Sequence, residues 1–157
     1  MATSPVTGKA PEFELTAAVS GRIVRARAGR RLVLVFHGPK TTDAPKQVGK
    51  AVRADYPDAG DVLVANIVDL RSMDGMWRRV AEAGIKANYD RMAGRIQGGD
   101  PADYIVICPD WDGRVCQAFG VQDPNERPGA AVLDGDGNVV GVTTGTGLAE
   151  DVLRWLG

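Results

Sequence analysis

Apolar runs and helical stripes alternate along the first two thirds of the chain. Three runs have the length and β-branched content of buried strands: RLVLVF at 31–36, DVLVANIVDL at 61–70 and YIVIC at 104–108. Apolar positions at helical spacing predict a helix from about 43 to Tyr56, which ends before Pro57, and a longer one over roughly 72–97. Strands that alternate with helices predict a parallel sheet with helical crossovers.

The longer helical segment carries an apolar stripe at spacings of three to five residues. A stripe of this kind is more often part of the core than a ligand groove, so we expect its members to be packed inside. They are Met73, Trp77, Val80, Ile85, Tyr89, Met92 and Ile96.

The last third of the chain predicts an antiparallel hairpin. Strands at 130–134 and 139–145 flank the turn DGDGN, which lacks the glycine and acidic positions of a calcium loop, and an amphipathic helix follows at 147–156. A short helix is also expected within DWDGRVCQAFG, at 110–120. The predicted class is α/β, with a central mixed sheet, a terminal antiparallel hairpin and helices on both faces.

The N-terminal segment is small and polar, so residues 1–10 are predicted to be a flexible arm and 11–157 a single domain. In GRIVRARAGRR, apolar and basic residues alternate between glycines, which predicts a short exposed strand. Its arginines suit the protection of a sheet edge better than the binding of an anion. They are Arg22, Arg25, Arg27 and Arg30.

Charge and composition narrow the function classes. The 157 residues carry a net charge of −1, so no global field favours nucleic acid or an anionic membrane. We expect neither as a partner. No apolar run is long enough to span a bilayer, the N-terminus does not resemble a secretory signal, and the two cysteines form no disulfide framework. These features favour a cytoplasmic protein, and they leave its oligomeric state open.

Strand direction predicts a crevice at one rim of the sheet. The parallel strands end at His37, Asp69 and 108–110, and an antiparallel strand at 130–134 would begin at the same rim. A helix N-terminus near Asp43 with lysine and arginine nearby favours a small anionic ligand. The residues expected in or beside the crevice are His37, Lys40, Thr41, Thr42, Asp43, Asp69, Trp111, Arg127 and Pro128.

His37 is the only histidine and has three possible roles. A neighbouring helix N-terminus would keep its imidazole neutral and suited to general acid–base chemistry. It could also bind haem iron, or be a partly buried histidine hydrogen-bonded to a neighbour. Ligands for a zinc site are absent, and no metal or cofactor is predicted. Trp111 suits either stacking on a ligand or packing in a turn.

Cys108 and Cys116 lie eight residues apart across a predicted turn. Free buried cysteines that act as small hydrophobes fit this placement better than a redox pair, because Cys116 lies at an apolar helical position near Val115 and Phe119. A redox pair remains the alternative.

Three segments resemble the thioredoxin superfamily, in the branch that holds peroxiredoxins (alkyl hydroperoxide reductase and thiol-specific antioxidant proteins) and thioredoxin-like reductases. They are APEFELTAAVSGRIVRARAGRRLVLVF, VICPDWDGRVCQAFGV and RPGAAVLDGDGNVVG. The resemblance implies a thioredoxin-like fold over nearly the whole chain. It also implies that Pro128 matches a proline that is cis in thioredoxins, which leaves cis and trans open here. Arg127 lies near an arginine that steadies the reactive thiolate of peroxiredoxins.

The reactive motif of that superfamily does not carry over. Its cysteines follow the first central strand, where this chain has HGPKTTDAPKQ, so that Thr41 and Ala44 lie where a cysteine pair would be. A hydroxyl cannot replace a thiolate nucleophile because its pKa is far too high. Thiol–disulfide exchange and thiol peroxidation at this position are therefore excluded.

Three functions fit these observations. The first is a cofactor-free enzyme or small-molecule-binding protein in which His37 moves a proton while Lys40 and Arg127 hold an anionic ligand. The second is a non-catalytic binding module that uses the same crevice. The third is a redox protein that uses Cys108 and Cys116, or haem on His37. Whether the protein is an enzyme is not decided by the sequence.

Overall fold

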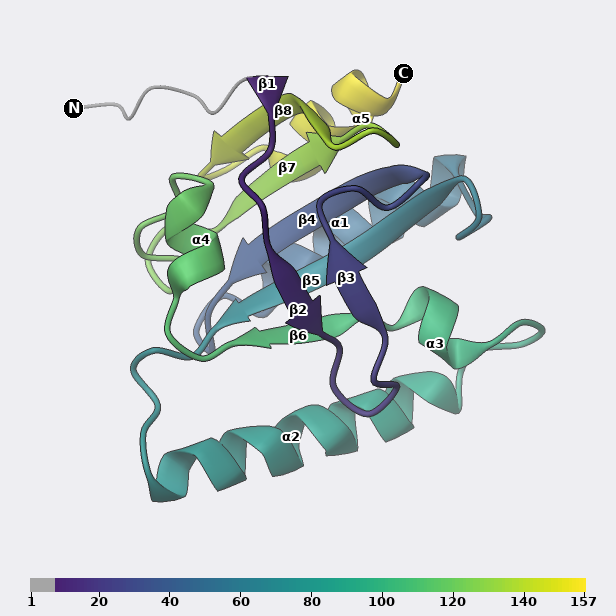
Figure 1. Ribbon diagram of the computed structural model, residues 1–157. Helices are drawn as coiled ribbons and strands as arrows, with labels where there is room; N and C mark the ends of the chain where they lie inside the picture. Colours follow the sequence, from purple (N-terminus) through teal and green to yellow (C-terminus); the bar gives the residue numbers. More distant parts are fainter. Residues whose placement is uncertain (1–7) are drawn as a thin grey trace.

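A mixed six-stranded sheet forms the centre of the computed structural model, which describes residues 8–157 (Figure 1). Strands β4, β5 and β6 run parallel, β7 is antiparallel to β4, and β8 is antiparallel to β7. The predicted mixed sheet with a terminal hairpin is confirmed. The strands, in spatial order, are β1 (Gly8–Lys9), β8 (Asn138–Thr144), β7 (Gly129–Leu133), β4 (Arg31–His37), β5 (Val62–Asp69) and β6 (Ile107–Asp110).

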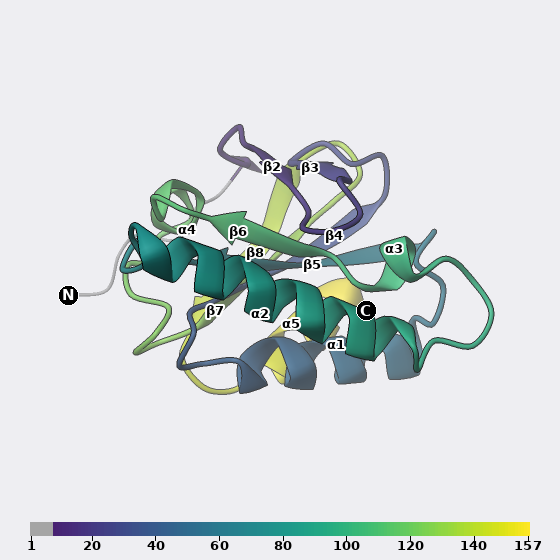
Figure 2. The same cartoon turned by 90° about the horizontal axis from the view of Figure 1, so that it is seen from below.

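Helices cover both faces of the sheet, as predicted. One face carries α1 (Asp43–Asp55) and α5 (Leu148–Leu156), with α2 (Met76–Ala93) alongside α1 near the β6 edge (Figure 2). The other face carries α4 (Arg114–Ala118) and the hairpin of β2 (Glu14–Thr16) and β3 (Ile23–Arg25). Among the described residues no helix is both long and apolar enough to cross a membrane.

The strand period of two divides the core into two layers. Leu32, Leu34 and Phe36 of β4 face α4 and the β2–β3 hairpin, where Phe36 packs against Phe119 with ring centroids 5.2 Å apart. Val33 and Val35 face α1 and α5. His37 continues the second series, and its face is therefore fixed by the alternation of β4.

Two boundaries differ from the sequence prediction. The run at 104–108 is split, because Pro101–Tyr104 form the short helix α3, whose first turn is capped by Asp100 through a 3.0 Å bond from the Ala102 amide. Strand β6 therefore starts at Ile107, where pairing with β5 begins. Gly8 and Lys9, at the end of the predicted flexible arm, pair with β8 as β1, while residues 1–7 lie outside the described part.

The prediction that the whole apolar stripe of 72–97 is core is wrong for Trp77 and Val80. Tyr89 is buried and Ile85 and Met92 pack against the sheet edge, but Trp77 is 61% exposed and Val80 55% exposed. The first turn of α2 extends past the tip of β6 in both views, so no strand lies beneath it (Figures 1 and 2). Helical spacing identified the helix but not the length of the surface it covers.

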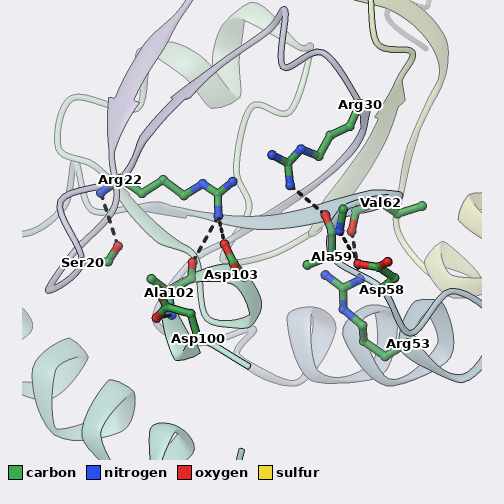
Figure 3. Close-up of polar contacts among 11 residues, drawn as sticks. Ser20, Arg22, Arg30, Arg53, Asp58, Ala59, Val62, Asp100, Ala102 and Asp103 are labelled. Atoms are coloured by element: carbon green, nitrogen blue, oxygen red, sulfur yellow. Dashed lines mark hydrogen bonds and ion pairs between the residues drawn. The ribbon is translucent and has the colours of Figure 1, made fainter. Parts of the chain in front are cut away.

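Arginines tie the periphery to the sheet at the end opposite the predicted crevice (Figure 3). Arg22 pairs with Asp103 of α3 at 2.9 Å, and Arg30 donates to the carbonyl of Ala59 at 2.9 Å. Arg53 of α1 donates to the carbonyl of Val62 at 2.9 Å, which fixes the helix to the start of β5. Arg22 and Arg30 therefore hold segments together, a role that the prediction of edge protection did not include.

The contact between β8 and α5 gives a stability prediction. A methyl group on Gly141 would overlap the indole of Trp155, so Gly141→Ala should destabilise the protein by about 1–3 kcal/mol through overpacking. Gly49→Ala is the matched control, because its methyl group meets nothing within 4 Å and α1 should gain about 0.5–1 kcal/mol. Urea unfolding measures both changes. Equal stability of the two variants would contradict the packing described here.

Candidate functional site

His37 is the last residue of β4 and lies at the carboxyl rim of the sheet with only 6% of its surface exposed. Its Nδ1 lies 3.1 Å from the carbonyl oxygen of Gly38, which makes Nδ1 the protonated nitrogen of a neutral ring. Burial lowers the pKa of the imidazole, and the Gly38 carbonyl partly opposes this. The ring is therefore a neutral base at pH 7, with the lone pair of Nε2 available.

The imidazole borders a cavity of about 430 Å³ between the sheet and the helices α1 and α2. Its floor consists of strand residues on the α1 face, among them Asn66 and Ile107, which pair in register, and Val68, which pairs with His37. Residues of α1 and α2 form its two walls. A largely apolar cavity of this size with a few polar groups suits a small organic molecule.

Two exposed cations stand at the edges of the cavity. Lys46 projects from α1 and Arg91 from α2, and Arg91 donates to Oδ1 of Asn88 at 2.7 Å. None of the described residues that line the cavity is acidic. Thr42 is also part of the wall. The electrostatic environment therefore favours an anionic group near the mouth.

The loop after His37 is held by the segment before β7. The Thr41 hydroxyl donates to the carbonyl of Pro124 at 2.6 Å and accepts from the Gly38 amide at 2.9 Å. The Lys40 amide donates to Oδ1 of Asn125 at 2.9 Å. Thr41 and the Lys40 backbone thus position the loop. Neither residue is among those that line the cavity.

The first turn of α1 follows this loop. Thr42 occupies the N-cap position, but its side chain makes no capping hydrogen bond. Asp43 is exposed in the first helical turn, where a negative charge is favourable, and it does not line the cavity. Thr42 therefore occupies the N-cap position without making the capping hydrogen bond.

Arg127 and Pro128 lie at the predicted rim but turn toward β8. Nε of Arg127 donates to the hydroxyl of Thr144 at 3.1 Å, and the carbonyl of Pro128 accepts from the Gly145 amide at 2.8 Å. All peptide bonds within residues 8–157 are trans, including the one before Pro128. The structure does not bring Lys40 or Arg127 to the cavity that His37 lines.

Asp69 and Asp110 pair in register at the same rim, but on the opposite face from His37. Asp110 is 2% exposed and accepts from the Cys116 amide at 3.0 Å. Arg71 lies 2.7 Å from Oδ2 of Asp69, although the geometry is too poor for a hydrogen bond. Burial raises the pKa of Asp110, so its ionised form is disfavoured in the folded protein.

Cys108 and Cys116 are both buried and free in the core layer beside these carboxyls. Burial raises the pKa of the Cys108 thiol to about 12. Burial, together with the charges of Asp110 and Asp69, raises the pKa of Cys116 still further. Neither sulfur is a thiolate near neutral pH, as expected of cysteines that act as small hydrophobes.

Trp111 lies outside the cavity. The guanidinium of Arg78 stacks over its ring at 4.9 Å from the centroid, and the ring packs against the small core under α2. The structure therefore shows Trp111 packed in its turn, and not positioned to stack on a ligand in the cavity. Within residues 8–157, no three histidine, cysteine or acidic side chains come together in a way that could hold a metal ion.

Most of the lining residues were not anticipated as site residues, among them the polar or charged Asn66, Lys46 and Arg91. Asn66 interrupts the apolar run VLVANIVD, and a polar residue within a buried strand is a signal that sequence reasoning could have used. Lys46 and Arg91 carried no such signal. Whether these two side chains reach the cavity depends on the distance between α1 and α2, and no local sequence pattern specifies that distance.

The fold resembles solved structures of thioredoxin-like proteins. StoA from Bacillus subtilis matches with a TM-score of 0.63 and 18% identity over 94% of this chain and 97% of its own. The pneumococcal exposed lipoprotein thioredoxin from Streptococcus pneumoniae matches with a TM-score of 0.64 and 19% identity, over 93% of this chain and 98% of its own. A thiol-disulfide oxidoreductase from Bacteroides fragilis matches with a TM-score of 0.61 and 18% identity, over 94% of this chain and 98% of its own. No protein-family model and no curated protein sequence matches the chain.

The burial of both sulfurs predicts their reactivity. In the folded protein, Cys108 and Cys116 should react with a disulfide reagent at pH 8 at least about a hundredfold more slowly than a free thiol, because the thiolate fraction is small. Both should react at once in denaturant. Rapid labelling of either thiol in the native state would contradict this and would favour the redox alternative.

The raised pKa of Asp110 predicts a pH dependence of stability. Because the folded protein disfavours the ionised form, Asp110 destabilises at neutral pH and this penalty disappears as pH falls toward the unfolded value near 3.8. Asp110→Asn should therefore be more stable than the wild type at pH 7, with a difference that shrinks on acidification. Urea unfolding at several pH values measures this difference.

Asp112 offers a control of opposite sign. It is exposed, and the Arg114 amide lowers its pKa, so Asp112→Asn should be slightly less stable at pH 7 and equal to the wild type at low pH. A loss of stability in Asp110→Asn at neutral pH would show that its hydrogen bond outweighs the cost of its buried charge.

Proposed function

From a thioredoxin-like fold whose strand–helix junction contains no cysteine, we propose that the protein binds a small organic molecule in the cavity between α1 and α2. His37 would accept a hydrogen bond or a proton from that molecule. The observation that carries the proposal is the placement of a buried, neutral imidazole on the floor of a 430 Å³ cavity, with Nδ1 already bonded to Gly38.

The catalytic form of the proposal is general acid–base chemistry without a cofactor. A histidine with a lowered pKa is unprotonated at neutral pH and can remove a proton from a bound substrate. The Gly38 carbonyl fixes the ring, so that Nε2 is the atom that receives the proton. If the ligand only donates a hydrogen bond to Nε2, the same arrangement serves passive binding.

The redox alternative has less support. The fold neighbours include proteins named as thiol-disulfide oxidoreductases, but the two thiols of this chain are buried, free and weakly acidic. Haem on His37 is a separate version of that alternative, and an absorbance spectrum of freshly purified protein tests it. A Soret band would favour it over the binding of a colourless organic molecule.

The single histidine provides a direct test of the cavity. Its Cε1–H signal in the NMR spectrum should titrate with a pKa below 6.5, because burial favours the neutral ring. A fragment that donates to Nε2 should lower this pKa further, by favouring the unprotonated form. Screening small organic fragments against this signal identifies binders.

Adjacent substitutions on α2 supply the controls for this test. Gly84 lines the cavity and Ala83 does not, so Gly84→Trp should abolish the fragment-induced shifts while Ala83→Trp leaves them unchanged. Fragments that bind both variants equally do not occupy this cavity, and the proposal would then be wrong. A pKa at or above 6.5 would show that the imidazole is open to water rather than buried.

A further inference from the structure

We infer that the cavity ligand is an amphiphilic carboxylate that carries a hydroxyl group at the end remote from its acid group. This inference rests on the proposed function and assigns a ligand class to the same cavity. It follows from the chemistry of the cavity lining: two polar residues on the strands, apolar residues of the sheet and of α2, and two exposed cations on the helices.

The polar pair on the floor is His37 and Asn66. Asn66 lies opposite Val35 and Val68 lies opposite His37, so the two polar side chains are diagonal neighbours on one face of the sheet. Oδ1 of Asn66 is buried and has no hydrogen-bond partner in the described chain. The amide can turn about its broad, roughly two-fold χ2 and present either its NH₂ group or its oxygen to a ligand.

When the amide of Asn66 is turned so that its NH₂ group faces the ligand, a hydroxyl group matches this pair, because it can both donate and accept. Nε2 of His37 is an acceptor in the tautomer fixed by Gly38, while the amide NH₂ of Asn66 is a donor. One hydroxyl can donate to the imidazole and accept from the amide at the same time. An apolar ligand end would leave both groups desolvated and unpaired, which is unfavourable.

Most of the remaining lining of the cavity is apolar. Val68 and Leu70 on the strand side face Met73, Ile85 and Met92 from α2 and the segment before it. This surface suits a hydrocarbon chain or ring, and methionine side chains adapt to irregular shapes. The cavity volume of about 430 Å³ lies within the range of sites that hold small organic ligands.

The mouth is cationic on both sides. Lys46 and Arg91 come from different helices, and within the described lining there is no acidic residue to neutralise them. Arg91 is already held at Asn88, which directs a guanidinium suited to carboxylate recognition. An anion at the mouth and a hydroxyl at the floor place the two polar ends of the ligand at opposite ends of the cavity.

Three eight-carbon probes test the inference by calorimetry: ω-hydroxyoctanoate, octanoate and octanol. We expect ω-hydroxyoctanoate to bind about fivefold more tightly than octanoate, the effect of one net hydrogen bond. Octanol, which lacks the charge, should also bind more weakly than ω-hydroxyoctanoate. Asn66→Leu should reduce the preference for the hydroxylated acid, because octanoate would no longer leave the amide unpaired and should bind at least as tightly as it does to the wild type.

Charge variants test the mouth. Lys46→Gln should weaken the binding of both acids by about two- to fivefold without changing that of octanol, since the interaction is solvent-exposed. Lys50→Gln, one turn further along α1 and outside the cavity lining, should change none of the three. Circular dichroism confirms that each variant is folded.

The outcomes separate the two proposals. If octanol binds as tightly as the acids, and Gly84→Trp still blocks binding, the ligand class is wrong while cavity binding stands. If none of the probes and no fragment binds, or if Gly84→Trp has no effect, cavity binding itself is wrong.

Discussion

The hydrogen bonds that hold residues 38–41 to residues 124–125 are the constraint on which the site depends. Thr41 joins the two segments through Pro124, and the Lys40 amide joins them through Asn125. A side chain on Gly38 would overlap Asn125, so glycine is needed for this close approach. Because the Gly38 carbonyl fixes the imidazole and Thr42 begins the helix, the same contacts set the floor and one wall of the cavity.

A hydroxyl suits this junction for a physical reason. Thr41 donates one hydrogen bond and accepts another within a partly buried loop, and so satisfies two backbone groups of different segments. A thiol is a weak donor and a weak acceptor, and would satisfy them poorly. The junction of this chain therefore uses Thr41 for structure, and under the proposed function the acid–base chemistry belongs to the imidazole at the end of the strand.

Much of the fold was predictable because local sequence patterns determine it. The strand that ends at His37, the helix that ends before Pro57 and the hairpin around Asp134 follow from periodicity and from turn residues. The errors arose where the neighbours decide the outcome. The length of β6 follows from its pairing with β5, and Trp77 is exposed because the sheet ends before it.

The site was predictable only in part. Strand direction placed His37, Asp69 and Arg127 at one rim, and they do lie there. Direction alone does not say on which face each side chain emerges or how far apart α1 and α2 lie. Lys46 and Arg91 were therefore not predicted as site residues. Lys40 and Arg127 were predicted in the site, but neither lines the cavity.

The opposed faces of His37 and Asp69 have a consequence for proton movement. The two residues end neighbouring strands, but His37 lies in register with Val68, so its imidazole and the carboxyl of Asp69 emerge on opposite sides of the sheet. They cannot form the hydrogen-bonded dyad in which a carboxylate raises the basicity of a histidine. Under the proposed function, a proton accepted by Nε2 would leave through the ligand or through the mouth of the cavity, which would couple its departure to exchange of the bound molecule.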